Sequence, residues 1–345
     1  MIPAATTPLH AASPPPVLPL QSVRWQQLWR EAVRDPGELL SMLGLESLSG
    51  RVSSEADAQF PLRVPRGFVA RMRHGDAHDP LLRQVLPLDQ EMRITPGFSL
   101  DAVGDGAARA GAGVLRKYRG RALLVTTGSC AVNCRYCFRR HFPYAEETAA
   151  RDGWREAVQA IRADTGIDEV ILSGGDPFSL ATSRLAELTG ALAGVDHLKR
   201  LRIHTRLPVV LPDRVDAPLL QWMKGLPWPV AVVIHANHAN EFDASVDSAL
   251  AGLRDAGARL LNQAVLLRGV NDSVEALADL GERSFTAGVL PYYLHQLDRV
   301  AGTAHFEVSD QEARKLHAAL AARTSGYLVP RLVREVAGDP GKRPL

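Results

Sequence analysis

Short apolar runs alternate with amphipathic stretches over most of the chain. Apolar runs with strand character occupy 122–127, 169–172, 200–204, 229–234, 259–267 and 287–294. Helical periodicity follows each of them, near 151–164, 181–193, 214–225, 241–256, 273–284 and 309–323. Continuous apolar strands separated by helices are typical of βαβ units, in which helices cover a parallel sheet. Six such units predict an α/β fold with an open, incomplete (β/α)6 barrel, since a closed barrel of this kind has eight.

The chain before the first strand-like run has a different character. Residues 1–20 are rich in proline, alanine and serine, which predicts a flexible lead-in. Apolar residues recur at helical spacing over 22–45, where Asp35-Pro36 marks the start of a second helix. Prolines interrupt 50–118, which predicts short helices and loops. The predicted parts of the chain are the lead-in at 1–20, a helical N-terminal region at 21–95, a barrel at 96–325 and a C-terminal tail at 326–345.

Composition and charge narrow the class of protein. The 345 residues carry a formal net charge of +2 and are 46% hydrophobic, as in an ordinary soluble globular protein. This near-neutral balance gives no support to binding of nucleic acid or of a membrane surface. Three cysteines exclude a secreted disulfide framework and indicate a reducing compartment. Because no stretch of about 18 uncharged apolar residues and no basic leader occur, the expected location is the cytoplasm.

All three cysteines lie on one loop directly after the first strand. Cys130, Cys134 and Cys137 have the spacing C-x3-C-x2-C, and three thiolates this close can bind one metal centre. On a cubane 4Fe-4S cluster they leave one iron without a protein ligand, and that iron can chelate a substrate. The alternative is a structural zinc site with His141 as the fourth ligand, although structural zinc usually takes its ligands from two separate segments.

A glycine-rich segment, Ser173-Gly174-Gly175-Asp176-Pro177, follows the second strand. Two glycines allow a ligand to approach the backbone closely and leave amides exposed to a carboxylate. A tight turn between strand and helix would also use glycines, so both interpretations stay open. One strand away from the cysteine loop, the segment fits a site for the amino-acid end of S-adenosylmethionine.

The ends of the later strands are also polar. They read His204-Thr205-Arg206, then 235–241, then Asn262-Gln263, and finally His295-Gln296-Leu297-Asp298. Any single one of them could be a buried, satisfied polar group or a helix cap. Because the carboxyl ends of parallel strands meet at one edge, together they predict a polar cavity at the mouth of the barrel.

The C-terminal tail, GDPGKRPL, contains Lys342, one of only five lysines in the chain. One interpretation is a frayed, solvated end. The other is a turn of Gly338, Pro340 and Gly341 that directs the amine inward, since the preceding TSGYLVPRLVREV is apolar and orderly. A lysine held in a cavity can form a Schiff base with an aldehyde cofactor, of which pyridoxal phosphate is the obvious candidate.

From about residue 80 to its end, the chain resembles the lysine 2,3-aminomutase family of radical S-adenosylmethionine (SAM) enzymes. The resemblance rests on the motifs LRKYRGRALLVTTGSCAVNCRYCFRRHF, SGGDP, HTRLPVVLPDRV, NHANE, NQAVLLRGVND, HQLD, TSGYLVP and GK-x-P. The family fold is an incomplete, TIM-like (β/α)6 barrel. The short chain, its end just after GKRPL and the absence of further cysteines resemble the elongation factor P branch. That branch makes (R)-β-lysine, which a separate ligase attaches to a lysine of elongation factor P.

The resemblance implies cofactor-binding residues. The ligands of the 4Fe-4S cluster would be Cys130, Cys134 and Cys137. Lys342 would form the Schiff base with pyridoxal 5′-phosphate. The other groups near that cofactor would be Lys117, Tyr118 and Arg121. The SAM site would include Ser173, Gly174, Gly175 and Asp176. Lys117 stands where the family has arginine.

The resemblance also implies residues that bind the two ends of the substrate. Arg139 matches the arginine that holds the substrate carboxylate, a task that suits a bidentate guanidinium. Asp298 matches one of two acidic residues that hold the remote ammonium. Glu335 stands at the second of these positions, where the family has aspartate, so its arm is one methylene longer. The alternative for Glu335 is a surface salt bridge with Arg331 or Arg334.

The implied activity is an isomerase reaction, the conversion of L-lysine to (R)-β-lysine by a radical mechanism. An electron donor such as flavodoxin or ferredoxin would reduce the cluster, and a homo-oligomer is compatible with the sequence. Three alternatives stay open: an aminomutase of arginine or glutamate, a radical enzyme without pyridoxal phosphate, and a non-catalytic zinc-binding module. Two acidic groups facing the far end of the substrate favour a cationic chain, and so favour lysine over glutamate.

Overall fold

The computed structural model describes residues 23–145, 148–149 and 154–345. The lead-in predicted at 1–20 lies outside the described residues, as do the first three residues of the helix predicted at 151–164. The described chain forms a ten-stranded sheet whose strands follow one another in sequence order. None of the helices in the described ranges is long and apolar enough to cross a membrane.

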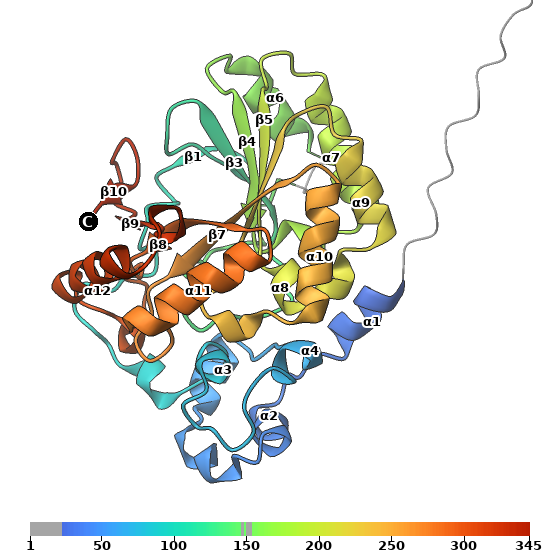
Figure 1. Ribbon diagram of the computed structural model, residues 1–345. Helices are drawn as coiled ribbons and strands as arrows, with labels where there is room; N and C mark the ends of the chain where they lie inside the picture. The colour runs from blue at the N-terminus through green and yellow to red at the C-terminus, as the bar shows by residue number, and fades with distance from the viewer. Residues whose placement is uncertain (1–22, 146–147, 150–153) are drawn as a thin grey trace, which may run out of the picture.

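Six parallel strands make up the centre of the sheet, as the apolar runs predicted. They are β3 (Arg121–Thr127), β4 (Glu169–Gly174), β5 (Arg200–Thr205), β6 (Val230–Ile234), β7 (Arg259–Val265) and β8 (Leu290–His295). The predicted helices are present as α6 (Arg155–Ala163), α7 (Thr182–Ala193), α9 (Ala217–Lys224), α10 (Ala244–Asp255), α11 (Val274–Thr286) and α12 (Asp310–Arg323). Figure 1 shows the helices arranged around the outside of the curved sheet. The prediction of an incomplete (β/α)6 barrel is confirmed.

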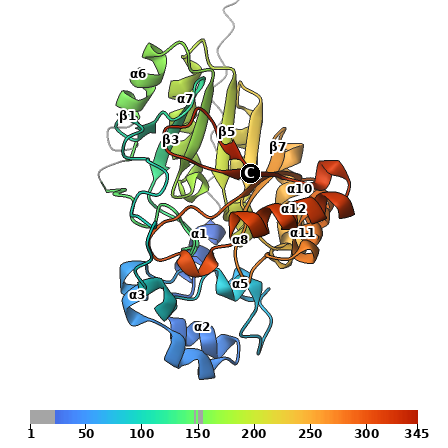
Figure 2. The same ribbon diagram turned by 90° about the vertical axis from the view of Figure 1, so that its left-hand side faces the viewer.

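The sheet extends beyond these six strands at both edges. Before β3, the short strands β1 (Arg109–Gly111) and β2 (Val114–Leu115) pair antiparallel. After α12, β9 (Arg331–Arg334) continues the parallel sheet beside β8, and β10 (Arg343–Pro344) turns back antiparallel to β9. The six strands expected from the sequence are therefore joined by four more in the same sheet. The apolar segment before the tail supplies a seventh parallel strand, and the last residues of the chain are attached to it (Figure 2).

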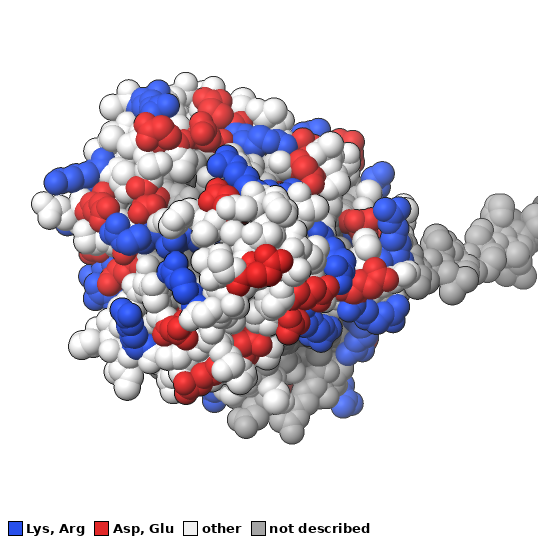
Figure 3. Space-filling model, turned by 90° about the horizontal axis from the view of Figure 1, so that it is seen from below, with Lys and Arg blue, Asp and Glu red and all other residues white. Residues whose placement is uncertain are grey.

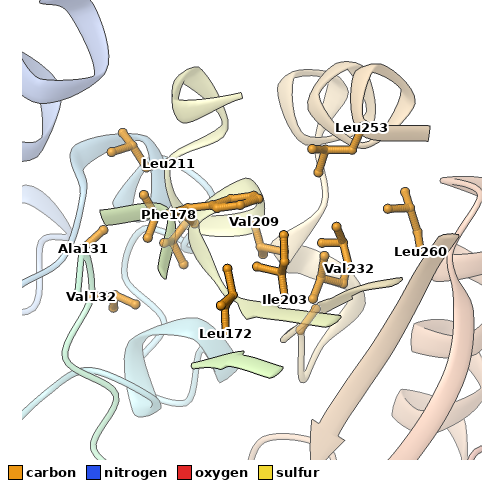
Figure 4. Close-up of a cluster of buried hydrophobic side chains, with 14 of the residues drawn as sticks. Ala131, Val132, Leu172, Phe178, Ile203, Val209, Leu211, Val232, Leu253 and Leu260 are labelled. Carbon is orange, nitrogen blue, oxygen red and sulfur yellow. The ribbon is translucent and has the colours of Figure 1, made fainter. Parts of the chain in front are cut away.

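Side chains along each strand point alternately to the outer core and to the cavity inside the barrel. Leu172, Ile203 and Val232 lie on three neighbouring strands and are completely buried. Figure 4 shows them on one side of the sheet, with Phe178 and Leu253 packed above them. Because successive side chains of a strand point to opposite faces, the residues next to these three point into the barrel.

The N-terminal region consists of short helices, as predicted. They are α1 (Val23–Arg30), α2 (Pro36–Met42), η1 (Glu46–Arg51), α3 (Ser54–Gln59), α4 (Arg66–Val69), α5 (Pro80–Arg83) and η2 (Asp89–Met92). The predicted restart at Asp35-Pro36 is confirmed, since Asp35 Oδ1 accepts a hydrogen bond from the Glu38 amide (2.7 Å) at the start of α2. This region covers the lower end of the barrel in Figure 1. On that end, basic and acidic side chains are interspersed, in keeping with the small net charge (Figure 3).

Candidate active site

A cavity of about 240 Å³ lies inside the barrel, at the carboxyl ends of its strands. The candidate cofactor- and substrate-binding residues all line this cavity: Lys117, Tyr118, Arg121, Cys130, Cys134, Cys137, Arg139, Ser173, Gly174, Gly175, Asp176, Asp298, Glu335 and Lys342. His141, the candidate fourth ligand of the zinc alternative, is not among its lining residues. The predicted polar cavity is therefore present, and the candidate residues share it. The individual roles of these residues remain predictions.

The N-terminal region holds the cysteine loop in place. Arg135, between the second and third cysteines, donates its amide hydrogen to Gln84 O (2.9 Å) and is completely buried. Its guanidinium forms two hydrogen bonds to Glu91 of η2, at 2.8 and 2.6 Å. Arg140 also bonds to Glu91, at 2.8 Å. One buried carboxylate thus fixes the loop at two points, and the two arginines are structural groups rather than a basic surface.

The cysteine side chains are not arranged as the ligands of a single metal ion. In 23–145, 148–149 and 154–345, no group of three or more His, Cys, Asp and Glu side chains is arranged to hold one metal ion. His141, the fourth ligand of the zinc alternative, has Nε2 3.1 Å from Ala301 O. A four-iron cluster binds each thiolate to a different iron, so its ligands stand further apart than those of one ion. Burial raises the pKa of the Cys130 thiol, and that of Cys137 to about 11. A metal centre supplies the positive charge that such thiols need for deprotonation.

The glycine-rich segment is a close contact between the ends of β3 and β4. Gly174 has φ +113°, and a Cβ built there would lie 2.7 Å from Thr127 O. A Cβ on Gly175 would lie 2.5 Å from Ser129 O, beside the cysteine loop. The backbone therefore requires glycine at both positions, as the tight-turn interpretation states. We call Gly174 and Gly175 the glycine cradle. Both residues also line the cavity next to the three cysteines, as binding of SAM requires.

Asp176 connects the glycine-rich segment to the end of β5. Its carboxylate accepts hydrogen bonds from Thr205 Oγ1 (2.6 Å), the Arg206 amide (2.7 Å) and the Phe178 amide (3.0 Å). Burial raises its pKa to about 6, although these hydrogen bonds act in the opposite direction. The carboxylate is thus engaged with the protein itself, which favours a positioning role for this residue beside the cavity.

The C-terminal tail turns inward, so Lys342 is not a frayed end. Gly338, at φ +83°, lies in the turn between β9 and β10. Lys342 Nζ lies 2.8 Å from Glu335 Oε2. Arg334 bonds instead to Asp310 (2.6 Å), so the surface salt bridge considered for Glu335 is absent from the described contacts. The side chains of Lys342 and Glu335 face the cavity from one edge of the sheet.

Asp105 belongs to the same network, and the sequence analysis missed it. Its Oδ2 accepts a hydrogen bond from Arg139 Nε (2.7 Å), and its Oδ1 lies 2.6 Å from Lys117 Nζ. Lys117 Nζ also lies 2.8 Å from Glu335 Oε1. The charges therefore alternate from Arg139 to Lys342 across the open side of the barrel. Between two glycines, Asp105 has the sequence character of an ordinary turn residue, and only its position in the fold identifies it.

This network sets the charge of its carboxylates. Burial raises the pKa of Glu335, but Lys342 and Lys117 outweigh it and bring the pKa down to about 2. The pKa of Asp105 is likewise below its usual range, because the positive charges of Arg139 and Lys117 outweigh the effect of its burial. Asp298 behaves in the opposite way, since burial and then the nearby Glu335 charge raise its pKa to about 7.

The remaining walls carry aromatic and imidazole groups. Arg121 places its guanidinium carbon 4.6 Å from the ring centre of Tyr118, so these two predicted neighbours of pyridoxal phosphate form a cation–π pair. His204, His235 and His295 also line the cavity. Burial lowers the pKa of all three imidazoles, that of His235 to about 4, so they are neutral at pH 7.

Comparisons with known proteins agree with this geometry. Residues 124–281 match the Radical SAM superfamily. Over 325 residues, the chain is 48% identical to the L-lysine 2,3-aminomutase of Escherichia coli (strain K12), covering 93% of this chain and 94% of that protein. It is 44% identical to the Haemophilus influenzae enzyme of the same name, covering 92% of this chain and 94% of that one. The Clostridium subterminale enzyme of that name is 30% identical, with 93% of this chain and 77% of that protein covered.

Proposed function

The chain belongs to the lysine 2,3-aminomutase family of radical SAM enzymes, and we propose that it converts L-lysine to (R)-β-lysine. It is an isomerase that uses a 4Fe-4S cluster, SAM and pyridoxal 5′-phosphate. When bound, these groups supply a carbon radical that removes and returns a hydrogen atom, and a conjugated system through which nitrogen migrates. The protein holds the reacting atoms together and excludes water from them.

In this proposal, three parts of the cavity wall hold the cofactors. The cluster takes Cys130, Cys134 and Cys137 as ligands, and the adjacent glycine cradle receives the amino-acid end of SAM. Lys342 holds pyridoxal phosphate on the opposite side of the cavity. The support for this arrangement is that the cysteines and Lys342 line one cavity although they lie on segments far apart in the sequence.

The substrate would be held at both ends. Arg139 is buried, its Nε donates to Asp105 and its Nη1 donates to Ser173 Oγ (3.2 Å). The guanidinium is therefore held in one orientation at the cavity wall, where it would bind a carboxylate. Asp298 and Glu335 line the same cavity and would bind the distal ammonium. One fixed arginine and two carboxylates that line the same cavity carry the proposal. This pairing suits an amino acid with a cationic side chain and disfavours glutamate.

We further propose that the product supplies the modification of elongation factor P through a separate ligase. The support is that the chain has no cysteines besides the three of the loop, a feature in which it resembles that branch. Incubation with the ligase and elongation factor P should add the mass of one β-lysyl group to a lysine of that factor. No mass change with β-lysine present would contradict this part of the proposal.

Anaerobic assays with single amino acids test the reaction itself. The reconstituted protein is incubated with a reductant, SAM and L-lysine, L-arginine or L-glutamate, and the products are separated on a chiral column. The proposal predicts (R)-β-lysine from L-lysine and much less β-amino acid from the other two. Preferential conversion of arginine or glutamate, or the (S) product, would contradict it.

A further inference from the structure

Arg206, at the end of β5, places a buried guanidinium against the cysteine loop. Its Nη1 lies 2.6 Å from Cys134 Sγ and 2.6 Å from Tyr136 Oη. Its Nη2 donates to Gln84 Oε1 at 2.7 Å and to Glu241 Oε2 at 2.9 Å. The side chain is 6% exposed, so its position is set by the protein rather than by solvent.

Several separate parts of the fold converge on this group. Gln84 follows α5 in the N-terminal region, and Glu241 ends η5 (Ala239–Glu241) after β6. The Arg206 amide is bound by Asp176, which also fixes the glycine-rich segment. Glu241 is itself completely buried and accepts a hydrogen bond from the Asn237 amide (2.8 Å). A buried arginine needs one carboxylate to neutralise its charge, and Glu241 supplies it for Arg206. The additional neutral partners of Arg206 fix the orientation of its guanidinium group.

We propose that Arg206 is a positioning and tuning residue of the iron–sulfur centre, and that it raises the reduction potential of the cluster. The inference rests on the proposed function, because it assumes that Cys134 is a cluster ligand. Reduction adds one negative charge to the cluster. A cationic donor beside a ligating sulfur stabilises the reduced form more than the oxidised form. The effect is strong because the site is buried, where charges are poorly screened.

A merely structural role predicts different behaviour. If Arg206 served only to neutralise Glu241 and connect β5 to the N-terminal region, its loss would lower stability and leave the potential unchanged. Two variants separate these roles. R206Q removes the positive charge but leaves Glu241 buried without it. R206Q/E241Q removes both charges, keeps the side chains similar in size, and leaves the local net charge unaltered. The double variant therefore isolates the hydrogen bond to sulfur, and it is also the variant better able to fold.

Arg214 provides a matched control. It is completely buried and donates to Phe178 O (2.6 Å) and Leu180 O (3.0 Å), yet it does not line the cavity. R214K should lower the melting temperature without altering the cluster. The four proteins are reconstituted anaerobically without lysine or pyridoxal phosphate. Their iron and sulfide content is determined, and their midpoint potentials are measured by redox titration followed by electron paramagnetic resonance.

We expect R206Q and R206Q/E241Q to bind the same amount of iron as the wild type, because all three cysteines remain. Both should titrate at a more negative potential, and R214K should titrate with the wild type. An unchanged potential in the double variant would overturn the inference, as would loss of iron from a variant that is still folded. If the wild type itself holds no cluster, the proposed function fails. If its cluster is present and only the shift is missing, this inference alone fails.

Discussion

Lys117 Nζ lies 2.8 Å from Glu335 Oε1, across the gap between the two edges of the sheet. The resemblance of the sequence motifs implies arginine and aspartate at these two positions in the family, so we expect this chain to depart from the family pattern at both. Lysine carries a compact ammonium group where arginine has a planar guanidinium, and the glutamate side chain is one methylene longer than that of aspartate. Because the two residues form one ion pair, we expect the effects of exchanging them to be coupled.

This coupling predicts the outcome of a double-mutant cycle. K117R and E335D alone should each raise the KM for L-lysine, because each mismatches the length of the remaining partner. K117R/E335D should recover part of the loss, with an interaction free energy of about 0.5–3 kcal/mol. Steady-state kinetics of the four proteins, at equal iron content, measure it. Strictly additive effects would show that the two positions act independently.

The tail lysine should be needed for pyridoxal phosphate and not for iron. In K342A the protein should lose the visible absorbance of the protein–cofactor Schiff base while it keeps its cluster, because the three cysteine ligands are unchanged. K315A, at an exposed position of α12, is the matched control and should behave as the wild type. Borohydride reduction followed by peptide mass mapping locates the modified lysine. Cofactor attached to any residue other than Lys342 would exclude the assignment.

The carboxyl group of Asp298 should give substrate binding a distinctive pH dependence. Burial and then Glu335 raise its pKa to about 7, so the group is neutral below that pH and charged above it. Only the charged form attracts the distal ammonium, so kcat/KM for lysine should increase as the pH rises through about 7. D298N should lose this rise, and the missing charge should cost about 2–5 kcal/mol of binding. A D298N profile that keeps the wild-type rise would assign it to another group.

The glycine cradle should not tolerate even one methyl group. In G175A the new Cβ would meet the Ser129 backbone at 2.5 Å, so the cysteine loop or the end of β4 has to shift. We expect a loss of about 1–3 kcal/mol in the free energy of unfolding, with weaker binding of SAM. G190A is the control, since its methyl group meets open space on α7 and should stabilise the helix by about 0.5–1 kcal/mol. Denaturant titration and equilibrium binding of SAM compare the two, and equal affinities would contradict a role for the cradle.

Strands, helices and chemical motifs could be predicted because each is a local pattern. The parallel strands contain short, largely apolar runs, and the cysteine and glycine segments lie directly after two of them in the sequence. The strand β9 was missed because only four residues form it and the sheet, rather than its own pattern, determines its state. Asp105 and the ion-pair network were missed for a related reason. The network forms only where two edges of the sheet come together. Its residues are far apart in the sequence, so no local sequence pattern predicts it. The sequence did mark Arg206 as one of several polar strand ends, but only the fold brings it to Cys134.

The most direct test of the account follows the migrating nitrogen. L-lysine labelled with a heavy isotope at its 2-amino group is incubated with the anaerobically reconstituted, reduced protein, SAM and pyridoxal phosphate. Magnetic resonance of the product then shows which carbon carries the label. The account predicts (R)-β-lysine with the labelled nitrogen on carbon 3, formed only when SAM is present. Recovery of lysine with its label still on carbon 2, from protein shown to contain the full cluster, would contradict it.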